Sequence, residues 1–77
     1  MTLTPEQCRA ARALLDWSQP DLAAASGIGR STITRLERGS LVPHQSNLAS
    51  LRQALESAGV EFLDETRMRG PGVCLRK

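Results

Sequence analysis

The chain has 77 residues, 40% of them hydrophobic, with only two aromatic side chains and a formal net charge of +2. This length supports one small domain whose folding buries about 60% of the unfolded surface, so a partner subunit is expected to add stability. No apolar run approaches the roughly 18 residues of a membrane span and the amino terminus lacks a signal-peptide pattern, so a cytoplasmic protein is expected.

The first predicted helix runs from about Thr4 to Asp16. Thr4 is a suitable N-cap, Pro5 suits the first helical position, and Glu6 places an acid in the first turn. Cys8 falls on the apolar side of this helix, where a small buried side chain is expected.

A second and a third short helix are predicted within Gln19–Arg38, meeting at Gly27. Ser18 begins a capping box with an aspartate in its third position, and Gly27 falls where the chain leaves the helix with positive φ. The third helix is expected over Arg30–Arg38 and ends at the following glycine. The positions that must be apolar for two helices to cross steeply are all apolar: Leu22, Ala23, Ile28, Ile33 and Leu36.

The remainder of the chain predicts a loop over Ser40–His44, a fourth helix from about Gln45 to Ala58, and two short strands at 60–64 and 72–76. Leucines recur at spacings of three and four along the fourth helix, and Gly59 ends it. The strands are separated by a charged turn with glycine and proline, which favours a carboxy-terminal hairpin. A loose, solvated tail is the alternative.

The third helix presents a hydrogen-bonding face once Ile33 and Leu36 turn inward. An arginine fork fits either a guanine edge or a phosphate, and no carboxylate interrupts the centre of this face. An ordinary solvated helix face is the alternative, which the glycine turn and the apolar spacing disfavour. The outward side chains are Arg30, Ser31, Thr34, Arg35 and Arg38.

Charge is segregated along the chain. Residues 30–55 hold four arginines and one acid, residues 56–66 hold four acids and no base, and residues 67–77 hold four bases and no acid. The region around the third helix is therefore basic, and the tail can pair with itself or with a partner.

These residues resemble the Cro/repressor-type helix-turn-helix family, also called XRE-like, over residues 5–58. The likeness includes Ser18 and Gln19 at the start of the second helix, Gly27 in the turn, and the run 36–39 (Leu-Glu-Arg-Gly) that ends the third helix. The chain departs from the family pattern at Pro20, Ser26 and Gly29, of which proline and glycine suit the starts of helices. The resemblance implies a mainly α fold, a small lambda-repressor-like bundle of about four helices.

The resemblance also implies roles for individual residues. Arg30, Ser31, Thr34 and Arg35 are expected to read bases, and Gln19, Thr32 and Arg38 to bind or position phosphates. His44 is a loop residue that is a candidate for a further phosphate contact. The resemblance pairs Arg12 with Glu37 as scaffolding, beside Ala23 and Gly27 in the helix-turn-helix.

The sequence thus predicts a sequence-specific regulator of transcription that binds a palindromic operator in double-stranded DNA as a homodimer. Residues 1–59 are expected to bind DNA and residues 60–77 to join two subunits, with the transcription machinery as a further candidate partner. The alternative is a protein-interaction module of the same fold that sequesters another regulator or a toxin. No enzymatic activity, metal or cofactor is expected, because the sequence lacks a paired acid and base, a phosphate-binding glycine loop and metal-ligand spacing.

Overall fold

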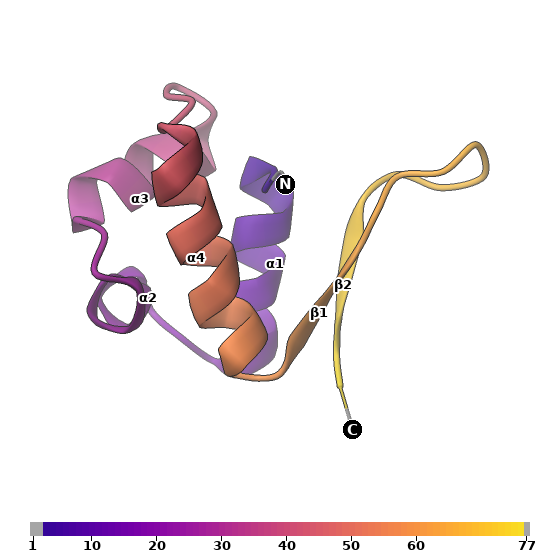
Figure 1. Ribbon diagram of the computed structural model, residues 1–77, viewed down its shortest axis with the longest axis horizontal. Helices are drawn as coiled ribbons and strands as arrows, with labels where there is room; N and C mark the ends of the chain where they lie inside the picture. Colours follow the sequence, from indigo (N-terminus) through magenta and orange to yellow (C-terminus); the bar gives the residue numbers. More distant parts are fainter. Residues whose placement is uncertain (1–2, 77) are drawn as a thin grey trace.

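A computed structural model describes residues 3–76, which form four helices followed by an antiparallel hairpin (Figure 1). The mainly α class with a carboxy-terminal hairpin is therefore confirmed. The elements are α1 Pro5–Leu15, α2 Gln19–Ser26, α3 Arg30–Arg38, α4 Gln45–Ser57, β1 Val60–Leu63 and β2 Gly72–Leu75. No helix in this part of the chain is long and apolar enough to cross a membrane.

The first two helices begin with reciprocal capping boxes. The Thr4 hydroxyl accepts from the Gln7 backbone N–H at 3.0 Å, and the Gln7 side-chain oxygen accepts from the Thr4 N–H at 3.1 Å. Ser18 and Asp21 form the equivalent pair at the start of α2, at 3.2 and 2.9 Å. These bonds satisfy backbone donors that the first turn of a helix leaves without partners, which fixes where each helix begins.

The helix ends follow the glycines. Gly27 and Gly39 close α2 and α3 with φ of 76° each, in the left-handed region that glycine enters without steric cost. Asp16 ends α1 in the same region, with φ of 57°, and is the single non-glycine residue with positive φ among residues 3–76. Its position at the end of α1 matches the sequence prediction.

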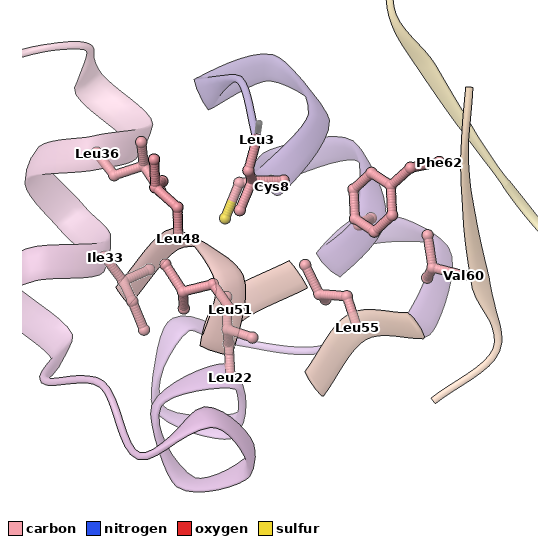
Figure 2. Close-up of a cluster of buried hydrophobic side chains, with 11 residues drawn as sticks. Leu3, Cys8, Leu22, Ile33, Leu36, Leu48, Leu51, Leu55, Val60 and Phe62 are labelled. Atoms are coloured by element: carbon pink, nitrogen blue, oxygen red, sulfur yellow. The ribbon is translucent and has the colours of Figure 1, made fainter. Parts of the chain in front are cut away.

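One hydrophobic cluster joins the helices and the first strand. Figure 2 shows leucine and isoleucine side chains from the helices pointing toward one another, with Val60 and Phe62 of β1 on the opposite side of the same cluster. Trp17 packs against this cluster and is partly buried. The buried members are Leu3, Cys8, Ala11, Leu22, Ile33, Leu36, Leu48, Leu51, Leu55, Val60 and Phe62.

The hairpin is held against the helices by its own inner face and by one side chain of α1. Val60 pairs with Leu75 and Phe62 with Val73 in the antiparallel register. Gln7 donates from Nε2 to backbone oxygens of both strands, Leu63 at 3.4 Å and Gly72 at 3.2 Å. The turn end of the hairpin extends away from the helices (Figure 1).

Candidate nucleic-acid interface

The turn between α2 and α3 is closed by local hydrogen bonds. The Gly27 N–H donates to the Ala23 oxygen at 2.9 Å. The Ser26 hydroxyl donates to the Leu22 oxygen at 2.7 Å and accepts from the Ile28 N–H at 3.2 Å. Ser26 therefore bridges the end of α2 and the turn. Ala23 and Ile28 pack against the core, so the turn fixes the orientation of α3.

The third helix has one buried and one exposed side. Ile33 is completely buried and Leu36 is 3% exposed. The side chains at 30, 31, 35 and 38 are exposed, whereas Thr32 and Thr34 are half-buried. Among residues 3–76, none of the three arginines of α3 forms an ion pair. The exposed side therefore presents hydrogen-bond donors and positive charge, which suits a guanine edge or a phosphate.

The one carboxylate of α3 is turned into the protein. Glu37 is 5% exposed, and Arg12 of α1 donates to both of its oxygens, from Nε to Oε2 and from Nη2 to Oε1, each at 2.7 Å. Gln19 adds a bond from Nε2 to Oε1 at 3.0 Å, and the Cys8 thiol donates to Oε2 at 3.1 Å. Arg12 also donates to the backbone oxygen of Trp17 at 2.9 Å. This cluster ties α1, α2 and α3 together.

The charge states in this cluster follow from its hydrogen bonds. Burial acts to raise the pKa of Glu37, but the bonds from Arg12, Gln19 and Cys8 outweigh burial, so the pKa lies below its ordinary value. Burial raises the pKa of the Cys8 thiol well above its ordinary value, and the bond to Glu37 adds to the increase. Cys8 therefore donates as a neutral thiol to an ionised carboxylate.

Gln19 joins the start of α2 to the middle of α3. Besides its bond to Glu37, its side-chain oxygen accepts from the Thr34 hydroxyl at 2.7 Å. Sequence reasoning placed Gln19 at a phosphate and Thr34 at a base, and gave no sign that the two side chains bond to each other. That contact depends on how the helices cross, since the residues are 15 positions apart.

His44 and Arg52 both have partners within the molecule. The His44 ring is the N-cap of α4, where Nδ1 accepts from the Ser46 N–H at 3.2 Å. Sequence reasoning took His44 as a loop residue and a candidate phosphate contact and missed its capping role, although its place directly before a helix was a signal for capping. Arg52, which contributes to the basic balance of residues 30–55, lies over the Phe62 ring at 4.7 Å and pairs with Glu56 at 3.2 Å. Its charge therefore belongs to the hairpin side of α4.

Sequence reasoning also missed Arg9, which is exposed on α1 and donates from Nη1 to the backbone oxygen of Glu37 near the end of α3. A cation at this place complements the negative end of the helix dipole. No cluster of three metal-ligating side chains occurs among the described residues. The arrangement is thus a cationic helix face supported by hydrogen bonds from α1 and α2.

Comparisons with known proteins agree with this geometry. The model of the helix-turn-helix family matches residues 9–62. Over 47 residues the chain is 43% identical to an uncharacterized HTH-type transcriptional regulator of Mycobacterium tuberculosis (strain ATCC 25618 / H37Rv), covering 61% of this chain and 18% of that protein. A regulator of the same description from Sinorhizobium fredii is 39% identical over 51 residues, covering 66% of this chain and 26% of that protein. The matched part is thus a minor fraction of each relative's length.

Proposed function

Because this chain belongs to the XRE-type helix-turn-helix family, we propose that it is a sequence-specific regulator of transcription that places α3 in the major groove of double-stranded DNA. The observation that carries the proposal is the division of charge on α3. Three arginines occupy its exposed side, while its single carboxylate is turned inward and paired with Arg12. Such a regulator would act in the cytoplasm.

The proposed contacts divide along α3. Side chains near its amino-terminal half reach base edges, while contacts to phosphates set the register of the helix in the groove. The proposed base readers are Arg30, Ser31, Thr34 and Arg35. The proposed phosphate and positioning residues are Gln19, Thr32, Arg38 and His44, with Arg12, Glu37, Ala23 and Gly27 as their structural support.

We further propose that the protein binds a palindromic operator as a homodimer, with residues 60–77 as the dimerisation element. Two-fold symmetry places two α3 helices about 34–36 Å apart, or a multiple of this spacing, on one side of the duplex. Leu75 at the end of β2 is 45% exposed, which supports a role for this strand in contacting a second subunit.

The test is selection of bound duplexes from a random pool, followed by a salt titration on the selected sequence, because salt dependence separates phosphate contacts from base readout. A palindromic winner supports symmetric binding. If the protein selects no duplex, the proposal is wrong and the protein-interaction alternative is favoured. Capture of a partner regulator or toxin would then establish that alternative.

Arg35→Ala is expected to weaken binding to the selected site by about 1–3 kcal/mol and to relax the sequence preference at one position. Arg67→Ala is the matched control, because Arg67 is exposed and belongs to the segment between β1 and β2. This hairpin turn extends away from α3 (Figure 1). Removing Arg67 takes away the same charge without touching the proposed readers. An equal loss on every sequence for Arg35→Ala would instead assign Arg35 to a phosphate.

A further inference from the structure

A chain of hydrogen bonds runs from the core to the edge of the proposed recognition surface. Arg12 donates to both oxygens of Glu37 at 2.7 Å, Gln19 donates to Glu37 at 3.0 Å, and Thr34 donates to Gln19 at 2.7 Å. Thr34 is half-buried on α3, beside the exposed Arg35. This series of hydrogen bonds, called the relay below, therefore ends at the Thr34 hydroxyl, which borders the surface proposed to face DNA.

The chemistry of each group decides which partner donates in every hydrogen bond of the relay. The Glu37 carboxylate is held ionised by the Arg12 fork, and an ionised carboxylate can only accept. The Gln19 amide must therefore turn its NH₂ group toward Glu37, which leaves its oxygen facing Thr34. An amide oxygen also only accepts, so the single hydroxyl proton of Thr34 points at Gln19.

We propose that this relay makes Thr34 an acceptor-only contact, which takes a hydrogen bond from the exocyclic amino group of adenine or cytosine and cannot donate to guanine. A threonine hydroxyl with a free proton can bond to either kind of base edge. Because the proton of Thr34 is committed to Gln19, only its oxygen lone pairs remain for the groove. The inference rests on the proposed function and makes Gln19 a positioning residue for base selection.

Ser31 provides the internal contrast. Its side chain is exposed on α3, and among residues 3–76 its hydroxyl forms no hydrogen bond. The Ser31 hydroxyl is therefore free to rotate and can donate or accept. The hydroxyl groups of Ser31 and Thr34 thus differ in which base edges they can bind, although both are aliphatic hydroxyl groups on α3.

The experiment is bound-duplex selection with the full chain and four variants. Thr34→Val identifies the base position that Thr34 reads, because that position alone loses its preference. In the wild type we expect adenine or cytosine on the contacted strand there. Thr34→Ser keeps the hydroxyl and should keep this preference. Gln19→Met removes the acceptor, so we expect the same position to admit guanine and thymine, and Ser31→Ala should change a different position.

A second measurement uses the selected duplex with the contacted base replaced by its analogue without the exocyclic amino group, purine for adenine or pyrimidin-2-one for cytosine. Wild-type affinity should fall about 2- to 10-fold, the range expected for one hydrogen bond, and Thr34→Val should be indifferent to the replacement. Circular dichroism of each variant verifies that it is folded.

The outcomes separate this inference from the proposed function. If the protein selects no DNA sequence, both the proposed function and the acceptor-only role of Thr34 are wrong. If an operator is selected but Thr34→Val changes no position, or if wild type prefers guanine there, the acceptor-only role is wrong and the proposed function stands. A preference that survives in folded Gln19→Met also overturns the role of the relay.

Discussion

The Glu37 carboxylate shows how one buried charge is tolerated in so small a protein. Removing an ionised carboxylate from water is costly unless charged partners and hydrogen bonds replace its hydration. Arg12 supplies two of these bonds, and Gln19 and Cys8 supply one each. The same bonds orient the side chains of three helices, so the charge also specifies how α3 is held.

The lowered pKa of Glu37 makes the stability of the protein depend on pH. In the unfolded chain a glutamate titrates near a pKa of about 4.3, whereas the folded protein holds the pKa of Glu37 below its ordinary value. The stabilisation is therefore fully present above about pH 4.3 and is lost as pH falls through the lower, folded value. Acid should weaken the fold through this one residue.

Glu37→Gln tests this dependence. At pH 7 we expect a loss of about 3 kcal/mol in the free energy of unfolding, because Arg12 loses its ionised partner, and the gap to wild type should shrink below about pH 4. Urea unfolding between pH 3 and 7 measures both. The exposed Glu61, which forms no ion pair among the described residues, gives the control Glu61→Gln, which should follow the wild-type curve. A gap that stays constant at acid pH would contradict this account.

At the scale of elements, most helix boundaries could be predicted because their signals are local. Thr4 and Ser18 bond to backbone groups three positions away, and Gly27 and Gly39 take backbone angles that other residues avoid. Such signals need no knowledge of the tertiary fold. The strand ends were predicted to within one residue, because a turn rich in glycine and proline separates two short apolar segments.

Contacts between distant elements could not be predicted from the sequence. The bonds from Gln7 to both strands span more than 50 positions, and the bond from Gln19 to Thr34 spans a helix crossing. The position of Arg52 over Phe62 likewise depends on where the hairpin packs. The residue types of the proposed interface were therefore readable from the sequence, whereas the internal partners of Gln19 and Thr34 required the structure.

The three glycines around α3 should respond differently to substitution. Gly27→Ala and Gly39→Ala are each expected to cost about 1 kcal/mol, since φ is 76° at both positions, although a Cβ atom would meet nothing within 4 Å. Gly29 has φ of −64° and is an N-cap without a side-chain hydrogen bond, so Gly29→Ser should be neutral or stabilise by a few tenths of a kcal/mol. Thermal and urea unfolding measure all three. Equal losses would show that packing, not backbone conformation, governs these positions.

At the scale of the whole molecule, the proposed DNA surface and the hairpin lie on opposite sides of the bundle. Figure 1 shows α1 and α4 between α3 and the strands. The apolar face of β1 is largely used within one chain, because Val60 is 1% and Phe62 is 9% exposed. Removing the whole hairpin would therefore damage the core as well as any dimer interface. A point substitution on β2 is the sharper way to examine dimerisation.

Leu75 and Leu14 provide a matched pair for that experiment, since they are exposed leucines of similar accessibility, 45% and 40%, on β2 and on α1. If the hairpins join two subunits, Leu75→Glu places a charge in the interface, whereas Leu14→Glu adds the same charge outside it. Sedimentation should then show monomers for Leu75→Glu and dimers for wild type and Leu14→Glu. Affinity for a full palindrome should fall in parallel, because two half-sites would no longer be bound by one connected dimer. If only Leu14→Glu dissociates the dimer, the interface lies on α1. If the wild type binds the palindrome as a monomer, the hairpin has no role in DNA binding through dimerisation.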